Sequence, residues 1–397
     1  MALAALETEY VGKRGRLFRL AFWTGLLTVL TLGIYRFWMK TRLRRFYWSS
    51  VRPGGQPLEY VGEPLEKLLG FLIAVVFLAF YIGIVNLLLM FASFSLLNTN
   101  VAAYAVSFVG VLPIVFYARF RARRYILART RWRGVRFGMD QGAWGYAWRA
   151  LWHWTVTILT LGLLWPRMTF WLEKYRTDLT YFGSQKFVQR GQWKMLFRPM
   201  LPLWAGVIII LIGATVSYLE NETVGIPSIV LGALVALIGA VHYNVYSFRL
   251  LTNTKTLGDV SFVSKPRSKK VFWIYVSGYF LIIFLSILFA ILVLAVFFAV
   301  SFAMLPDFAD KDFIDLLDNN EGGMFLSSLL PLVLYFFVFV IWSALRQIFL
   351  VLPLARHYAE TLQIINADKL PVIGQRARDE FEEAEGFADA LDLGAAL

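Results

Sequence analysis

The chain has no cysteine and only three histidines among its 397 residues. Disulfide bonds, thiolate catalysis and cysteine-ligated metal sites are therefore excluded. Charged residues are also scarce, at 16%, whereas hydrophobic residues reach 59%; soluble domains contain about 25% and about 45–50% of these classes. The few charges are unbalanced, with a formal net charge of +13. An apolar but basic chain is typical of a multispanning membrane protein whose loops carry the positive charge.

Long uncharged runs predict the layout of such a protein. A spanning helix needs about 20 mostly apolar residues, and six runs meet or approach that length. They fall in three pairs, 68–97 with 101–118, 199–219 with 224–248, and 271–306 with 322–345. We therefore expect an all-α polytopic membrane protein with six transmembrane helices in three hairpins.

Two shorter apolar runs, 20–35 and 150–166, belong to an internal repeat with a constant offset of 129 residues. Each contains the tripeptide Thr-Leu-Gly, at 31–33 and 160–162, where glycine relaxes the backbone and a bend is expected. The repeat predicts four successive segments. They are a first copy at 1–145 with hairpin 68–118, a second copy at 146–270 with hairpin 199–248, a third hairpin with its arm at 271–375, and an acidic tail at 376–397.

The distribution of Lys and Arg orients the expected spans, because cytoplasmic loops collect these residues. If only the six long runs cross the membrane, one side holds 38 of the 39 basic residues, whereas eight crossing runs divide them 22 to 17. The six-span arrangement places both termini in the cytoplasm and makes 20–35 and 150–166 re-entrant or interfacial segments. The rival eight-span arrangement gives an inverted repeat that suits a transporter.

Between the apolar runs, basic and aromatic residues alternate at helix-like spacing. Such arms suit helices at the level of the lipid headgroups, with cations on anionic phosphates. The arginines that we expect to bind headgroups are Arg42, Arg44, Arg45, Arg119, Arg121, Arg123 and Arg124. Apolar runs around every arm favour the lipid bilayer over nucleic acid as the partner. Short alternating stretches at 58–62, 132–137, 179–183 and 259–262 predict a small cytoplasmic β element.

Residues suited to catalysis are scarce as well. No HExxH, P-loop, GxSxG or EF-hand pattern occurs, so we expect neither enzymatic activity nor a cofactor or metal. Polar residues and glycines at membrane depth are the remaining candidates for a bend or a solute path: Thr31, Gly33, Asn86, His153, Thr160 and Gly162. Hydrogen bonding within the protein is the alternative interpretation of the polar ones.

Residues 31–42, Thr-Leu-Gly-Ile-Tyr-Arg-Phe-Trp-Met-Lys-Thr-Arg, resemble the YjgN-like family of bacterial inner-membrane proteins. The second copy at 160–167 and the Tyr-x-Gly arm ends at 60–62 and 181–183 strengthen the resemblance, which covers nearly the whole chain. The resemblance implies a multipass protein of the bacterial inner membrane. It carries over no catalytic residue.

Three functions are compatible with these features. The repeat and the bends favour a transporter or channel for a small solute or lipid. The basic arms favour a membrane-organising scaffold that binds anionic lipid headgroups. A membrane-embedded enzyme acting on lipid is disfavoured by the shortage of intramembrane acids and histidines.

Overall fold

The structure is a computed structural model that describes residues 5–80, 83–84, 87–97, 100–219, 222–304 and 321–376. The chain divides into two compact units. Unit 1 comprises Met1–Val11, Arg44–Phe272 and Arg356–Leu397, and unit 2 comprises Gly12–Leu43 and Trp273–Ala355. The predicted acidic tail after residue 376 and the acidic connection at 305–320 lie outside the described residues.

Ten strands of unit 1 form one antiparallel sheet. They are β1 (Leu6–Tyr10), β2 (Val51–Pro53), β3 (Leu58–Tyr60), β4 (Thr130–Trp132), β5 (Val135–Met139), β6 (Thr180–Phe182), β7 (Gln185–Gln189), β8 (Lys255–Leu257), β9 (Val260–Ser264) and β10 (Leu362–Ile365). Their spatial order is β2-β1-β10-β9-β8-β7-β6-β5-β4-β3. The outermost strands, β2 and β3, are consecutive in the chain and contact each other, so the sheet nearly closes on itself.

Tight turns and helical segments alternate as connections between the strands. Turns join β2 to β3, β4 to β5, β6 to β7 and β8 to β9, and each contains a glycine with positive φ: Gly54, Gly134, Gly183 and Gly258. Helices join β1 to β2, β3 to β4, β5 to β6, β7 to β8 and β9 to β10. Because adjacent strands are antiparallel, the helical connections leave and re-enter at one end of the strands, and the turns occupy the other end.

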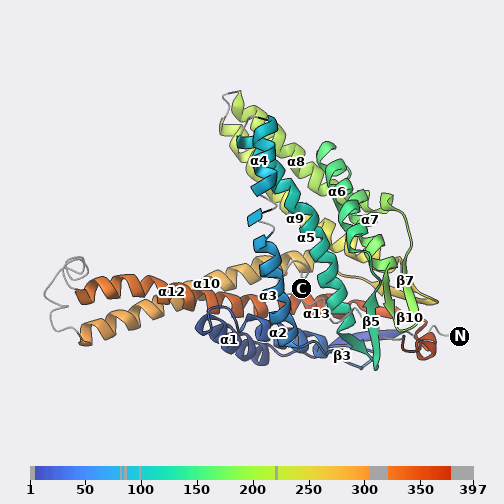
Figure 1. The fold of residues 1–397 in the computed structure, drawn as a ribbon, viewed down its shortest axis with the longest axis horizontal. Helices are drawn as coiled ribbons and strands as arrows, with labels where there is room; N and C mark the ends of the chain where they lie inside the picture. The colour runs from blue at the N-terminus through green and yellow to red at the C-terminus, as the bar shows by residue number, and fades with distance from the viewer. Residues whose placement is uncertain are drawn as a thin grey trace. The chain divides into compact units, whose positions relative to one another are not determined.

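Three helical connections lie wholly in unit 1. They contain α3 (Pro64–Phe80), α4 (Leu87–Leu97) and α5 (Asn100–Ala128), then α6 (Ala143–Leu159) and α7 (Trp165–Asp178), then η2 (Trp193–Leu196), α8 (Phe197–Tyr218) and α9 (Glu222–Asn253). Four further elements belong to the unit in whole or in part: the end of α2 (Arg36–Ser50), the beginning of α10 (Ser268–Met304), the end of α13 (Leu352–Glu360) and η5 (Ala367–Val372). Figure 1 shows α8 and α9 running side by side, and α6 packs on α5.

Glycines bring α8 and α9 into close contact. Gly206 and Gly213 on α8 are seven residues apart, as are Gly225, Gly232 and Gly239 on α9, and all five are buried. A Cβ at Gly232 would lie 2.7 Å from the backbone nitrogen of Ile210, and one at Gly213 would lie 2.8 Å from that of Ile229. Small residues at this spacing let backbones approach where lipid supplies no hydrophobic driving force.

Unit 2 is helical in its described part. It contains α1 (Arg14–Leu30), the beginning of α2, most of α10 (Ser268–Met304), α12 (Glu321–Arg346), η4 (Gln347–Val351) and the beginning of α13. Its core is formed by Ile282, Ile341, Leu345 and Leu350, and Phe22 of α1 packs against them. The acidic connection between α10 and α12 is not described.

The expected all-α fold with six transmembrane helices and a small β element is wrong. Strands do occur in the four alternating stretches, but ten of them pair into one large sheet. Among the described residues, four helices are long and apolar enough to span a membrane: Trp193–Tyr218, Glu222–Asn253, Ser268–Val296 and Leu334–Glu360. The first expected hairpin includes residues 81–82, 85–86 and 98–99, which lie outside the described residues.

Candidate functional site

The two Thr-Leu-Gly tripeptides form turns of the same conformation, one between α1 and α2 and one between α6 and α7. Leu32 and Leu161 both have φ of 49°, and the following Gly33 and Gly162 have φ of 94° and 84°. Glycine takes such positive values without the steric cost that other residues incur. The chain therefore reverses directly after each short helix.

The threonines of these turns are bonded within their own helices. The Thr31 hydroxyl donates to the carbonyl of Leu27 at 2.7 Å and accepts from the N–H of Tyr35 at 2.9 Å. Thr160 makes the corresponding bonds to Val156 and Leu164, at 2.9 and 3.3 Å. Both hydroxyls therefore have hydrogen-bond partners close by in the chain, which is the arrangement described by the alternative interpretation of hydrogen bonding within the protein.

His153 and Asn86 complete the candidates for a path. His153 is buried on the inner face of α6, where its Nδ1 accepts a hydrogen bond from Arg167 at 3.3 Å. Burial and the charges of Arg167 and Arg149 lower the pKa of His153, so the ring stays neutral near pH 7. Asn86 lies outside the described residues.

The seven arginines expected at lipid headgroups divide into internal and exposed groups. Arg44 and Arg124 are buried, and they donate to the Tyr60 hydroxyl at 3.2 Å and to the Met139 carbonyl at 2.9 Å. Arg123 pairs with Glu173. The others are more exposed: Arg42 over the Tyr35 ring, Arg45 bonded to the Gly62 carbonyl, Arg119, and Arg121 bonded to the Tyr117 hydroxyl.

A buried acidic residue holds three basic residues together. The Glu173 carboxylate on α7 lies 3.5 Å from Arg123 of α5, 2.8 Å from Arg176 and 2.6 Å from Lys255 of β8. The cluster joins two helices to the sheet and stayed unrecognised in the sequence. The available signal was that Glu173 is one of only two acidic residues, with Asp178, in the strongly basic arm at 167–198. An acidic residue in such a segment can compensate buried positive charge.

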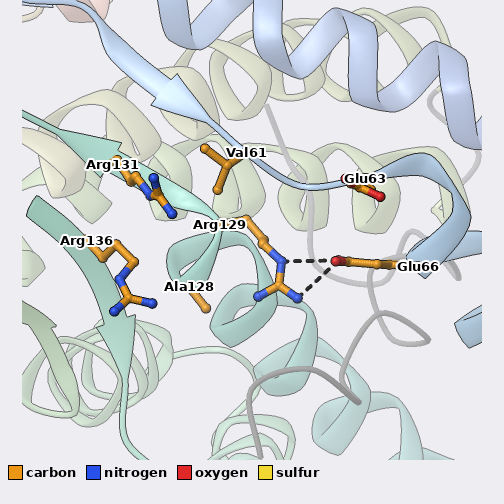
Figure 2. A pocket seen from close by; sticks show the side chains of 7 residues that line it. All are labelled: Val61, Glu63, Glu66, Ala128, Arg129, Arg131 and Arg136. Atoms are coloured by element: carbon orange, nitrogen blue, oxygen red, sulfur yellow. Dashed lines mark hydrogen bonds and ion pairs between the residues drawn. The ribbon is translucent and has the colours of Figure 1, made fainter. Parts of the chain in front are cut away.

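A small pocket lies where β3, β4 and β5 meet the ends of α3 and α5 (Figure 2). Its volume is about 180 Å³, and its lining consists of Val61, Glu63, Glu66, Ala128, Arg129, Arg131 and Arg136. We call it the Arg131 pocket. Arg129 binds Glu66 through two nitrogens, each 3.1 Å from the same carboxylate oxygen. The Tyr125 hydroxyl donates to that oxygen at 2.9 Å.

The outer side of the α6–α7 hairpin is apolar and aromatic. Trp144, Trp148 and Trp152 follow one another at four-residue spacing on α6, and more than half of each is exposed. Beyond them, Leu161 at the turn is 93% exposed. We call these four residues and Leu159 the α6 face. An apolar surface of this extent marks a contact with lipid or with another protein.

Basic residues with aromatic partners border the α6 face. Trp144 packs against Tyr117 of α5 with ring centroids 4.8 Å apart, and Arg121 lies over the same tyrosine. Arg149 lies 4.5 Å from the ring centre of Tyr175. No group of three His, Asp or Glu side chains that could hold a metal ion occurs in the described ranges.

Four apolar helices long enough to cross a bilayer, together with an antiparallel sheet, define a helical membrane protein with an associated β-sheet unit. The chain belongs to the family described as bacterial protein of unknown function (DUF898), whose model matches residues 5–285. The predicted YjgN-like relationship is confirmed. Inner membrane protein YjgN of Salmonella typhimurium is 29% identical over 141 residues, covering 34% of this chain and 33% of that protein. The chain thus matches about a third of that relative's length, and no solved structure matches it.

Proposed function

We propose that this is a bacterial inner-membrane protein that organises the cytoplasmic leaflet by binding anionic lipid headgroups. The name of the Salmonella relative supports the membrane, and the α6 face with its basic border supports the lipid contact. The sheet stands in the cytoplasm in this proposal. Because β1 and β10 pair, the segments near both termini then share that side, which agrees with the excess of basic residues in the arms.

The α6–α7 hairpin inserts its turn into the leaflet without crossing it. With 17 residues α6 is about 25 Å long, shorter than a hydrocarbon core of about 30 Å. The chain then reverses at Gly162 and returns as α7, which packs on α6 with Trp154 against Trp165. Tryptophans suit the interface, and exposed leucines suit the acyl chains below it.

The inserted turn predicts slow labelling of a cysteine at position 161. The natural chain has no cysteine, so Leu161→Cys provides a single thiol. In lipid nanodiscs we expect a charged maleimide to react at least about tenfold more slowly with this thiol than with that of Val372→Cys, because a buried thiolate is disfavoured. Val372 is the control because it is 82% exposed near the sheet.

Both variants should label equally after denaturation, which checks the reagent. Equal rates in nanodiscs would show that Leu161 is in water and would contradict insertion of the hairpin. The rates are measured by the mass of the labelled protein over time.

Headgroup binding predicts a change in the lipids that co-purify with the protein. Substituting Arg121 and Arg149 by glutamine removes two cations beside the α6 face, each worth about 1 kcal/mol near an anionic surface. We expect the enrichment of phosphatidylglycerol and cardiolipin over the bulk membrane to be lost. Lipid mass spectrometry of the purified protein measures it.

The matched control removes two exposed arginines of the sheet region, Arg133 and Arg190, by the same substitution. This double variant should keep the enrichment. Loss in both variants, or in neither, would contradict the assignment of the headgroup site to the border of the α6 face.

Transport of a small solute or lipid has less support. Of the described candidates for its path, Gly33 and Gly162 carry no polar side chain, Thr31 and Thr160 are bonded within their own turns, and His153 is buried against Arg167. The proposed binding of lipid headgroups requires no catalytic step, so in this proposal the protein is not an enzyme.

A further inference from the structure

The Arg131 pocket contains two arginines that the proposed binding of lipid by the α6–α7 hairpin does not use. Arg131 of β4 and Arg136 of β5 are direct cross-strand partners and therefore lie on the same face of the sheet. In the described part of the chain neither guanidinium has a hydrogen-bond or ion-pair partner, and Nε of Arg131 is buried. Two like charges in this position destabilise a strand pair unless something neutralises them.

Glu59 of β3 is the other cross-strand partner of Arg131, but among the described residues no carboxylate forms an ion pair with Arg131 or Arg136. Glu66 is already bound by Arg129 and by the hydroxyl of Tyr125. Figure 2 shows Arg131 and Arg136 at one end of the pocket, Glu63 and Glu66 at the other, and Arg129 between them. The pocket is therefore divided by charge, with two arginines that take part in no ion pair at one end, and Glu59 is the carboxylate across the strands from Arg131.

We propose that the Arg131 pocket binds a phosphate group through the guanidinium groups of Arg131 and Arg136. A guanidinium presents donors in a planar fork that matches phosphate oxygens, and such charge-assisted bonds are strong. The volume of about 180 Å³ is below the range of about 300–1,000 Å³ for drug-sized ligands, so the ligand part inside it is small. Glu63 disfavours further negative charge at the other end.

Two sources could supply this phosphate. One is a soluble phosphate compound of the aqueous phase, and the other is the headgroup of a phospholipid. Glu63 and Glu66 lie just before and within the first turn of α3, so the pocket adjoins a helical connection of the sheet. The chemistry at the two arginines is the same for both sources.

The test uses the full chain in phosphatidylcholine nanodiscs and measures its Tm. Inorganic phosphate is titrated at constant ionic strength in one arm, and phosphatidylglycerol replaces part of the lipid in the other. Phosphate should raise the Tm of the natural protein. In the Arg131→Gln variant and in the Arg136→Gln variant, the half-saturating concentration of phosphate should rise at least about tenfold, as expected for the loss of charged hydrogen bonds.

Two further variants test whether the charges of the pocket determine phosphate binding. Arg190→Gln removes an exposed cation that does not line the pocket, and it should leave the phosphate response unchanged. Glu63→Gln removes a negative charge from the pocket, so the half-saturating concentration of phosphate should fall. Without phosphate, Arg136→Gln should match or exceed the Tm of the natural protein, because the cross-strand partner of Arg136 is Arg131 and the substitution relieves their repulsion. An arginine that only supports the sheet would give the opposite sign.

The outcomes separate the sources as well. An arginine-dependent gain from phosphate assigns a soluble ligand, and one from phosphatidylglycerol alone assigns a lipid headgroup. If neither phosphate nor phosphatidylglycerol gives a rise in Tm that is lost in the two arginine variants, the proposal is wrong. None of these variants alters the α6 face or its border, so lipid bound there contributes a gain that is the same in the natural protein and in the variants. The part of the gain that is lost with Arg131 or Arg136 therefore reports the pocket alone.

Discussion

Replacing Glu173 by glutamine should lower the free energy of unfolding by about 3–5 kcal/mol, the range for removing one partner of a buried ion pair. The side chain is only 13% exposed, and its carboxylate is shared by Arg123, Arg176 and Lys255. Glutamine has nearly the same shape, so the packing is kept while three cations lose their counter-charge. Thermal unfolding of the solubilised protein, followed by tryptophan fluorescence, measures the change.

An exposed pair provides the matched control for this substitution. Arg356 and Glu360 are 3.8 Å apart on α13, and their side chains are 44% and 45% exposed. Glu360→Gln should therefore cost less than about 0.5 kcal/mol. If Glu173→Gln and Glu360→Gln were equally mild, the cations around Glu173 would have to be solvated, which contradicts the buried cluster.

The dependence on pH gives a second measurement on the same variant. Burial alone would raise the pKa of Glu173, but Lys255, Arg123 and Arg176 together lower it well below its ordinary value of 4.5. The folded state thus binds this proton less readily than the unfolded state. The stability from the carboxylate is present above pH 4.5 and is lost as the pH falls further. The difference between the natural protein and Glu173→Gln should shrink in the same range.

Replacing Gly232 by leucine should lower the free energy of unfolding by about 3 kcal/mol or more, at the upper end of the cost of overpacking. A Cβ at this position meets the backbone of α8, with the nitrogen of Ile210 at 2.7 Å. A helix backbone yields less readily than a side chain, so the two helices must separate. The Tm in nanodiscs measures the loss.

Gly15→Leu is the control for this prediction, because Gly15 is also helical and a Cβ there has nothing within 4 Å. The control should change the Tm little, since leucine favours helices over glycine. A similar, small effect of both substitutions would mean that α8 and α9 are not held by backbone contact. The result would then favour a looser hairpin.

The long helices could be predicted from the sequence, whereas the sheet could not. The run 199–219 falls within α8 except for its last residue, and the run 224–248 falls inside α9, because some twenty apolar residues without charge admit few other structures. The strands have only three to five residues each, too short for alternation to show convincingly. Their pairing also joins distant segments, such as Leu6 with Ile364, and no local pattern encodes that register.

Some of the candidate functional residues could likewise be placed from the sequence, and others could not. The turns fall at Thr-Leu-Gly, where the local chemistry of glycine is sufficient to mark them. The arginines of an arm look alike in sequence, but Arg44 and Arg124 are buried while Arg119 is exposed. Which side of an arm faces inward depends on how its helix packs on the sheet. The register of β4 and β5 brings Arg131 opposite Arg136, and the packing of α5 and α7 on the sheet surrounds Glu173 with cations.

The pairing of β1 with β10 determines the order in which the strands of the sheet can pair during translation. Every other neighbouring strand pair joins consecutive strands, so each can close soon after its second member is translated. β1 must wait for almost the whole chain, and until β10 emerges the edges of β1 and β9 stay open. An open edge accepts any matching strand. A chain stalled before Leu362 would therefore offer its gap to the β10 of a second copy, and exchange of that strand is the characteristic assembly error that this topology predicts.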